Sequence, residues 1–273
     1  MTVTLRNRLL RLGCAVLLGL AILSGLALRA DDKKPDHSAV KPDERKDRAA
    51  VDRHQEFLKK ADKDKIEVLF LGDSLTQGWE GGGKEVWKKH LEGLKAANFG
   101  IGGDRTQHLL WRITEGKELK DLKPKVVVLL IGTNNLNANG SDEIADGVNA
   151  IVKELNQQLP QAKVLLLGLF PRAVKKTDPF PIKGKDKDKD KDKEPKEKDP
   201  LREKVKEVNE RLAKLYDDKS NKNVRYLDIG AKFLDKDGEL SDRNMPNNVN
   251  LSPTGYQVWA DAMLPTLKEL LKE

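Results

Sequence analysis

Three apolar runs constrain the fold of this chain more than any other feature. They span residues 66–71, 125–131 and 163–170, and each ends at a Gly or a Pro. A strand that is apolar on both sides is buried on both faces, as in a parallel sheet covered by helices. Residues 96–99 and 224–229 are two weaker strand candidates. The sequence therefore predicts a five-stranded parallel sheet.

Amphipathic segments separate these strands. Ser141 opens a helix whose apolar residues recur at helical spacing as far as Leu159, and a second such pattern runs over residues 201–215. Ser252 and Pro253 suit the N-cap and the first position of a last helix. Strands that alternate with helices predict a three-layer α/β/α sandwich, in which ligands bind beyond the carboxyl ends of the strands.

The first 30 residues have the pattern of a secretory signal peptide. Three Arg precede an apolar run over residues 12–28, which ends near Ala30, just before two Asp. Cleavage near Ala30 would make the protein secreted or periplasmic. The alternative is an uncleaved anchor, since the run is at the lower limit of a membrane-spanning helix. Only in that case do we expect a membrane partner.

Two segments are too rich in charge to bury a core. Residues 31–50 hold 12 charged side chains in 20 positions, so we expect a disordered tether there. Residues 183–199 hold 15 charged side chains in 17 positions, with basic and acidic residues alternating. This pattern is typical of a solvated, disordered loop. The predicted folded domain therefore covers residues 51–273 and is interrupted by this loop.

Composition excludes several functional classes. Cys14 is the only Cys and there are four His, so a disulfide scaffold is ruled out, and neither a metal nor a cofactor is indicated. The formal net charge of +7 falls to +3 when the leader is removed with its four Arg. The sequence has no basic stripe with interleaved aromatic residues, which argues against nucleic acid as a partner.

The turns that follow three of the strands carry the candidate chemistry. Ser74 follows the first strand in chain order, Gly102 and Gly103 follow the second, and Asn134 follows the third. Acyl transfer requires a nucleophile flanked by hydrogen-bond donors, because the donors hold the oxyanion that develops on the substrate. A backbone N–H and a carboxamide are such donors. The three turns therefore predict one shared site.

These turns resemble the sequence blocks of the SGNH (GDSL) hydrolases. The chain has Gly-Asp-Ser-Leu at residues 72–75, Gly-x-Asn at residues 132–134 and Leu-Ser-x-x-Gly-Tyr at residues 251–256. The resemblance runs from about Arg53 to the C-terminus and is interrupted by the charged loop. Its motifs are specific.

Within that family, residues 98–112 and 124–135 are similar to blocks of the platelet-activating-factor acetylhydrolase catalytic subunits. The resemblance implies a flavodoxin-like sandwich and metal-free ester hydrolysis by a Ser-His-Asp triad. By position, it implies that Ser74 is the nucleophile, Gly103 the backbone oxyanion donor and Asn134 the side-chain oxyanion donor.

The last block departs from the family pattern. The family carries Asp-x-x-His directly before Leu-Ser, with the His as general base and the Asp as its orienting partner. This chain has Asn247 and Asn250 at those positions. A carboxamide has no basic site near pH 7, so Asn250 cannot accept the proton of Ser74. Loss of the base of such a triad lowers turnover on the order of 10⁶-fold.

The four His offer no obvious replacement for this base. His37 falls in the predicted tether, and His54 precedes the first strand, toward the opposite edge of the sheet. His90 lies on a Lys-rich, mostly solvated helical stretch, and His108 is expected to pack or cap locally on a helix that leads away from the site. Asp73, beside the nucleophile, is expected to be a structural hydrogen-bonding carboxylate.

Three interpretations of the function remain open. The chain is a family member that binds a small ester or an acetylated glycan and hydrolyses it weakly or not at all. Alternatively, it is an active secreted esterase that uses a substitute base, a water or a group of the substrate. In the third interpretation it is a non-catalytic structural or surface protein. An error in the sequence could also place Asn at both positions, but it would have to occur twice in one motif. The sequence leaves the oligomeric state open, a homodimer included.

Overall fold

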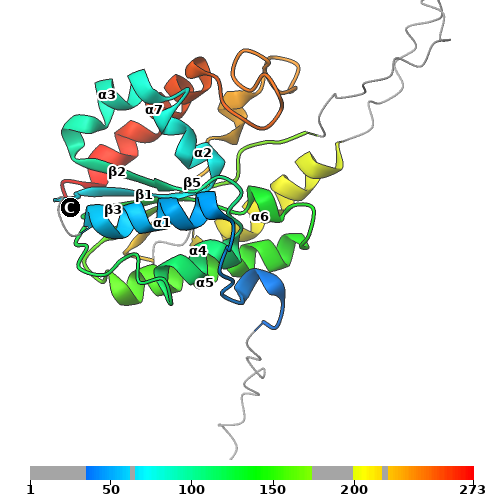
Figure 1. The fold of residues 1–273 in the computed structure, drawn as a ribbon. Coiled ribbons are helices and arrows are strands. Elements are labelled where there is room, and N and C mark those ends of the chain that lie inside the picture. Colours follow the sequence, from blue (N-terminus) through cyan, green and yellow to red (C-terminus); the bar gives the residue numbers. More distant parts are fainter. Residues whose placement is uncertain (1–34, 62–64, 174–198, 217–220) are drawn as a thin grey trace, which may run out of the picture. The chain divides into compact units, whose positions relative to one another are not determined.

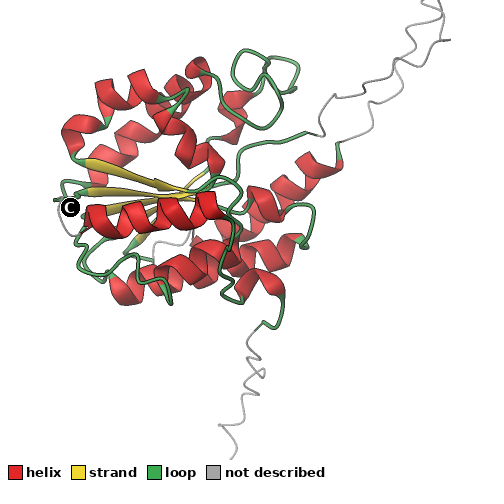
Figure 2. Cartoon of the chain, viewed as in Figure 1, coloured by secondary structure: helices red, strands yellow, loops and turns green. Residues whose placement is uncertain are grey.

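The computed structural model describes residues 35–61, 65–173, 199–216 and 221–273 (Figure 1). A parallel sheet lies between two layers of helices (Figure 2), which confirms the predicted three-layer α/β/α class. The strands are β1 (Val68–Gly72), β2 (Ala96–Gly100), β3 (Val126–Leu130), β4 (Lys163–Leu167) and β5 (Val224–Leu227).

The strand order is β2-β1-β3-β4-β5, and every pairing is parallel. This is the flavodoxin-like order, in which the chain winds outward in both directions from β1. β1 and β3 pair in register from Val68 with Val126 to Gly72 with Leu130. The crevice at the carboxyl ends of these two strands is therefore the place where such a sheet binds ligands.

The helices cover both faces of the sheet (Figure 1). One face packs against α1 (Arg48–Ala61), α4 (Thr106–Ile113), α5 (Ser141–Gln158) and α6 (Pro200–Tyr216), and the other against α3 (Lys84–His90) and α7 (Pro253–Leu270). The shorter helices are α2 (Ser74–Gln77), η1 (Ser38–Val40), η2 (Gly78–Glu80), η3 (Glu92–Leu94), η4 (Thr133–Asn135) and η5 (Gly230–Phe233).

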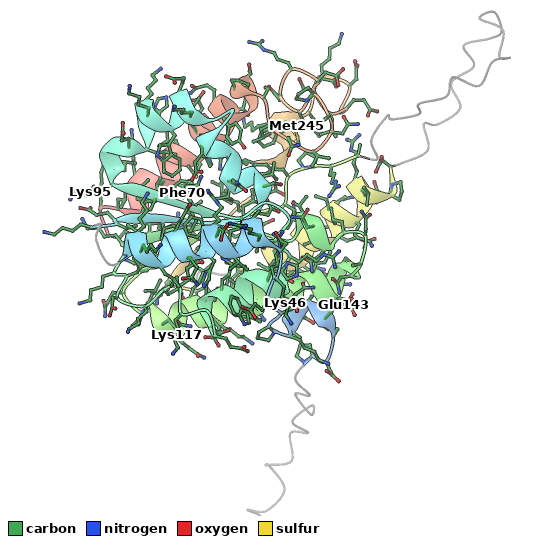
Figure 3. The ribbon with its side chains drawn as sticks, viewed as in Figure 1. Lys46, Phe70, Lys95, Lys117, Glu143 and Met245 are labelled. Atoms are coloured by element: carbon green, nitrogen blue, oxygen red, sulfur yellow. The ribbon has the colours of Figure 1, made fainter. Side chains whose placement is uncertain are left out.

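The side chains of β1 alternate between two apolar cores. Leu69 and Leu71 belong to the core on the α1 side, whereas Val68 and Phe70 belong to the core on the α7 side, and all four are 0% exposed. Figure 3 shows Phe70 within the domain, whereas Lys95 and Lys117 lie at its edge. Burial on both faces explains why this strand shows no polar alternation in the sequence.

Two strands are shorter than the apolar runs that predicted them. β4 ends at Leu167 although its run continues to residue 170, and β5 ends at Leu227, two residues before its predicted end. The backbone N–H and C=O of Leu169 bond to the carboxamide of Asn209 on α6, at 2.8 and 2.9 Å. A residue whose backbone is satisfied in this way leaves the sheet and yet stays buried.

The prediction of a disordered tether over residues 31–50 is wrong for residues 35–50, where η1 and the start of α1 lie. Ala39 is 0% exposed, and its carbonyl oxygen accepts a hydrogen bond from Thr106 Oγ1 at 2.8 Å. Gly147 on α5 makes room for this segment, since a Cβ there would lie 2.7 Å from the same oxygen. Backbone hydrogen bonds and close approach at small residues thus anchor a segment that has few apolar side chains.

The predicted signal peptide at residues 1–30 lies outside the described residues, as does the predicted loop at 183–199 except for its last residue. That residue is Asp199, whose carboxylate accepts the N–H groups of Leu201 and Arg202 at the start of α6. In the part of the chain that the structure describes, no helix has the length and apolarity needed to cross a membrane.

Candidate active site

Ser74 lies at the first position of α2, directly after β1. Asp73 caps this helix: its carboxylate accepts the Leu75 N–H at 2.9 Å, and its backbone oxygen accepts the Gln77 N–H at 2.8 Å. Asp73 is 1% exposed, whereas Ser74 is half-buried. The turn therefore leaves Ser74 accessible at the carboxyl end of the sheet, where its hydroxyl can meet a ligand.

The turn between β2 and α4 lies beside Ser74, since a Cβ on Gly102 would come within 3.7 Å of Ser74 Cβ. The N–H of Gly102 donates to Gln77 Oε1 at 2.7 Å, and its oxygen accepts a hydrogen bond from Arg45 Nη1 at 2.5 Å. Gly103 is exposed, and its φ of +84° lies in the left-handed region that favours glycine. The predicted nucleophile and the predicted backbone donor thus occupy adjoining turns.

Asn134 joins this cluster from the end of β3. Its Nδ2 donates to the backbone oxygen of Asp104 at 2.9 Å and, over 3.4 Å, to Asp73 Oδ2. The second distance is long for a hydrogen bond, so this is the hydrogen that a bound ligand can redirect. Ser74, Gly103 and Asn134 therefore lie on adjoining turns at the carboxyl end of the sheet, while their catalytic roles stay predictions.

The carboxyl group of Asp73, next to Ser74 in the chain, is buried. Burial raises the pKa of Asp73 to about 7, against the opposing effect of the Leu75 N–H; the Asp104 carboxylate adds to the rise and Arg172 reduces it. Both carboxyl oxygens of Asp73 have hydrogen-bond partners, from Leu75 and Asn134. This agrees with the expected structural carboxylate.

Asn247 and Asn250, at the family's Asp and His positions, lie on the loop before α7. Asn247 is exposed, and its Oδ1 accepts the N–H groups of Val249 at 3.1 Å and of Asn250 at 2.7 Å. The side chain of Asn250 is exposed, and among the described residues neither Asn hydrogen-bonds to Ser74. The bonds of Asn247 need only an acceptor oxygen, which Asp and Asn share.

Each of the four His has a partner other than Ser74. The pairs are His37 with Asp146 at 3.4 Å, His54 with Glu118 at 2.8 Å, His90 with Gln257 at 3.5 Å, and His108 with the Arg105 N–H at 3.1 Å. The local capping role expected of His108 is confirmed. His37, expected in a disordered tether, is instead half-buried in the ordered N-terminal segment.

A buried ion network underlies the glycine turn, and the sequence did not predict it. Arg112 on α4 pairs with Asp104 at 2.7 Å and with Glu118 at 2.6 Å, and these side chains are at most 3% exposed. Burial raises the pKa of Glu118, but the Arg112 guanidinium and a hydrogen bond with His54 outweigh it and hold that pKa below its ordinary value. In a chain with 35% charged residues, sequence spacing does not distinguish such a network from surface charge.

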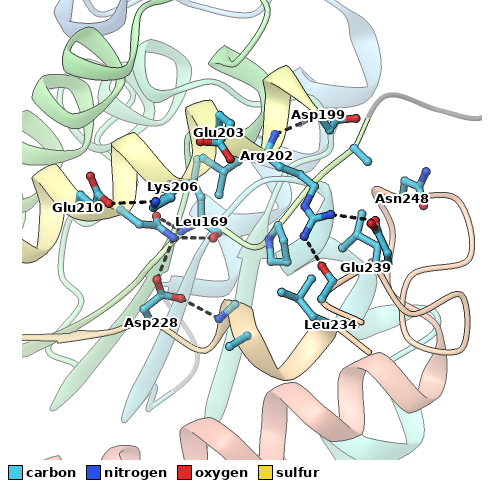
Figure 4. A pocket seen from close by; sticks show the side chains of 18 of the residues that line it. Leu169, Asp199, Arg202, Glu203, Lys206, Glu210, Asp228, Leu234, Glu239 and Asn248 are labelled. Atoms are coloured by element: carbon cyan, nitrogen blue, oxygen red, sulfur yellow. Dashed lines mark hydrogen bonds and ion pairs between the residues drawn. The ribbon is translucent and has the colours of Figure 1, made fainter. Parts of the chain in front are cut away.

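A cleft lies between α6 and the loop after β5 (Figure 4). Its volume is about 1260 Å³, and none of the predicted site residues lines it. Arg202 spans it and pairs with Glu239 at 3.0 Å. Ala173 and Asp199, which border residues 174–198, form part of its wall. This cleft is therefore separate from the turns that carry Ser74, Gly103 and Asn134.

Metal binding has no visible support among the described residues. No group of three His, Cys, Asp or Glu side chains there could hold a metal ion. Attack by a serine hydroxyl requires no metal, and the expectation of a site without metal or cofactor stays a prediction.

Known proteins match most of the chain. The family model described as GDSL-like lipase/acylhydrolase matches residues 70–258. The human platelet-activating factor acetylhydrolase IB subunit alpha2 is 34% identical over 223 residues, which are 82% of this chain and 85% of that one. The corresponding rat subunit is 35% identical with the same coverage.

Two solved structures share the fold. A GDSL-like lipase from Bacteroides thetaiotaomicron superposes with a TM-score of 0.58 at 19% identity, covering 79% of this chain and 97% of that one. A carbohydrate acetylesterase from Sinorhizobium meliloti superposes with a TM-score of 0.52 at 19% identity, covering 76% of this chain and 100% of that one. At these identities the likeness concerns the fold alone.

Proposed function

The chain belongs to the GDSL-like lipase/acylhydrolase family, and from this premise we propose that it binds a carboxylic ester at the crevice between β1 and β3 and hydrolyses it weakly or not at all. The observation that carries this proposal is the half-buried Ser74 next to a glycine turn, in which Gly103 is exposed and its N–H has no acceptor among the described residues. Ser74 is the nucleophile of the proposal, and Gly103 and Asn134 are the oxyanion donors.

The chemistry divides into a part that these residues supply and a part that they do not. Attack by Ser74 Oγ on the acyl carbon moves negative charge onto the carbonyl oxygen, where the Gly103 N–H and the Asn134 carboxamide stabilise it. The hydroxyl must lose its proton during this attack, and a general base has to accept it. Asn250 has no basic atom for that purpose. We therefore expect ligand binding to survive and turnover to be very low.

An active esterase with a substitute base is the second candidate. Asp73 favours it, because a pKa of about 7 would let this carboxyl exchange protons near neutral pH. Its oxygens are engaged by Leu75 and Asn134, however, and none bonds to Ser74. A water or a group of the substrate could serve in place of Asp73. Turnover that disappears in both Ser74→Ala and Asp73→Asn would favour the carboxyl.

Short acyl esters and acetylated glycans are the substrate class that we propose. Support comes from the relatives' printed name, an acetylhydrolase of platelet-activating factor, and from the name of one structural neighbour, a carbohydrate acetylesterase. An acetyl group is the common element of these names. The proposal therefore specifies the acyl group and not the alcohol.

Export from the cytoplasm is part of the proposal and rests on the sequence of residues 1–30. The protein would be secreted or periplasmic after cleavage near Ala30, and would have a membrane partner only if the leader were retained. Mass spectrometry of the N-terminus after expression in a secreting host tests this. A mature chain that begins just after Ala30 supports cleavage and export, and a membrane-bound chain that retains Met1 supports the uncleaved anchor instead.

Hydrolysis of short-chain aryl acetates by four forms of the full chain tests the main proposal. The forms are the unaltered protein, Ser74→Ala, the double substitution Asn247→Asp with Asn250→His, and that double substitution combined with Ser74→Ala. We expect turnover only in the double variant with Ser74 present. Ordinary esterase rates in the unaltered protein that depend on Ser74 would overturn the proposal in favour of an active enzyme.

A purely structural role gives a third result in the same experiment. In that case the double variant folds but stays inactive, and an alkyl boronic acid, which forms a tetrahedral adduct with an accessible serine, binds no better to the unaltered protein than to Ser74→Ala. That pair of results would show that more than the base has been lost from the crevice.

A further inference from the structure

Arg45 makes contact with the glycine turn next to Ser74. Its Nη1 donates to the backbone oxygen of Gly102 at 2.5 Å and to Asp104 Oδ1 at 3.1 Å, and its Nε donates to Asp47 Oδ2 at 2.9 Å. The Arg45 side chain is 22% exposed and that of Asp104 only 1%. One guanidinium therefore bridges the residues on either side of Gly103.

The oxygen that Arg45 holds and the N–H of Gly103 belong to the same peptide group. A trans peptide is planar, so its C=O and its N–H point in opposite directions. Fixing the Gly102 oxygen therefore fixes the direction in which the Gly103 N–H points. Gln77 Oε1 accepts the N–H of Gly102 at 2.7 Å. This bond restrains the peptide group on the N-terminal side of Gly102.

The Gly103 N–H itself is left available. It donates to no acceptor within the described ranges, and Gly103 is exposed. The φ of +84° at Gly103 favours glycine, and a Cβ there would lie 3.3 Å from Arg45 Nη1, which is a tight contact. A hydrogen bond from a cation to the carbonyl also polarises the peptide and strengthens its N–H as a donor.

We propose that Arg45 is a positioning residue for the oxyanion hole, which orients and polarises the Gly102–Gly103 peptide so that the Gly103 N–H is aimed at the bound acyl group. The inference rests on the proposed function of this crevice and adds to it a residue from the N-terminal segment, outside the three turns that define the site.

The N-terminal segment, residues 35–50, stays in place without Arg45. That segment is anchored independently by the bond from Thr106 to Ala39 O at 2.8 Å and by the bond from the Asp43 N–H to Gln107 O at 3.1 Å. Asp104 likewise keeps its ion pair with Arg112 when Arg45 is removed. Loss of the guanidinium should therefore act on the glycine turn and leave the segment folded.

The direct test observes the Gly103 amide by NMR. When only glycine is labelled, with ¹³C at the carbonyl and ¹⁵N at the amide, a carbonyl-to-amide correlation appears only where one Gly follows another. In this sequence those positions are Gly82, Gly83 and Gly103. We expect Arg45→Met to shift or broaden the Gly103 signal and to leave those of Gly82 and Gly83 unchanged.

Two further variants separate positioning from general effects of charge. Arg45→Lys retains a cation that can reach the Gly102 oxygen and should return the Gly103 signal toward its original position. Arg48→Met removes a neighbouring Arg whose side chain is 94% exposed and bonds to Asp52, and should change nothing. A Gly103 signal that is unmoved in Arg45→Met overturns the inference, whatever the activity of the protein.

Kinetics in the Asn247→Asp, Asn250→His background test the catalytic consequence. Complete removal of an oxyanion donor costs 10²–10³-fold in kcat, so a misdirected donor should cost roughly tenfold, with KM little changed. Arg45→Met should show this loss and Arg48→Met should not. An equal kcat in Arg45→Met and Arg48→Met would overturn the proposed effect of Arg45 on catalysis. If the background variant has no activity, the proposed function has failed and the Gly103 signal still decides the role of Arg45.

Discussion

The hydroxyl of Tyr256 donates a hydrogen bond to the backbone oxygen of Leu75 at 2.8 Å, across 181 positions of sequence. Leu75 directly follows Ser74, so this bond joins the first turn of α7 to the turn that carries the proposed nucleophile. The Tyr256 ring lies 4.7 Å from that of Trp79, centroid to centroid. Burial raises the pKa of Tyr256, so its hydroxyl stays protonated and remains a donor at ordinary pH.

Tyr256→Phe should lower the free energy of unfolding by about 1–3 kcal/mol, because the buried oxygen of Leu75 loses its partner. It should also weaken boronic acid binding at Ser74, since the turn that carries Ser74 loses a restraint. Urea unfolding and calorimetry measure the two effects. Tyr216→Phe is the matched control: its hydroxyl donates to Asn149 Oδ1 at 2.6 Å on α5, so we expect a loss of stability without a change in binding. Equal binding by both variants would contradict the restraint.

Asp73→Asn should change how stability depends on pH. The Asp73 pKa rises from 3.8 in the unfolded reference to about 7 in the folded chain. The folded state therefore holds a proton that the unfolded state releases, and the stability this contributes is complete below about pH 4 and lost as the pH rises through 7. Between pH 4 and 7, the unaltered protein should therefore lose free energy of unfolding relative to Asp73→Asn, by about 1.4 kcal/mol per pH unit.

Denaturant unfolding of both proteins from pH 4 to 8 measures this difference. Taking the difference removes the contributions of carboxyls with lowered pKa values, such as Glu118 and Glu67, which act in the opposite direction. Parallel curves for the two proteins would mean that Asp73 ionises normally in the folded chain.

Arg112→Met should lower the free energy of unfolding by about 3–5 kcal/mol, because Asp104 and Glu118 lose their buried counter-ion. The matched control is Arg225→Met, which removes ion pairs of 3.7 and 3.8 Å at a side chain that is 46% exposed. Its cost should stay within about 1 kcal/mol. Thermal or urea unfolding compares them, and similar losses would show that the buried network contributes no more than a surface pair.

Hydrolysis by the Asn247→Asp, Asn250→His variant should rise with pH around a midpoint of about 6.5, because only neutral imidazole accepts a proton and an unperturbed His titrates there. Asn250→His alone should be slower, since its ring lacks the orienting carboxylate. Rates of aryl acetate hydrolysis from pH 5 to 8 give the profile. A flat profile would mean that the new His is not the base.

The sheet and its layers could be predicted because burial on both faces leaves a direct mark on composition. The runs that became β1 and β3 are apolar throughout their paired residues, and Ser252 and Pro253 mark the start of α7 by cap chemistry that depends only on local residues. The ends of strands were less predictable. Leu169 leaves the sheet because of Asn209, which lies on a helix 40 residues later.

The N-terminal segment and the ion network could not be predicted for a different reason. In the sequence, Arg45 and Asp47 do not differ from the other charged residues of a hydrophilic stretch. Ala39 has too little apolar area for its burial to be predicted. Their order arises from backbone hydrogen bonds and from the space left by Gly147, which are visible only once α4 and α5 are assembled. Sequence patterns report apolar area and periodicity, and neither is present here.

The loop that holds Asn247 can fold without an acidic side chain at that position. Its turn needs one oxygen that accepts two N–H groups, and an amide serves as well as a carboxylate. Replacement of the acidic residue would therefore escape any selection that acts on stability alone. Two chains of this architecture, one hydrolytic and one silent, could fold equally well and match the same family model over the same residues. Two side chains on a surface loop, and not the similarity of the whole, would tell them apart.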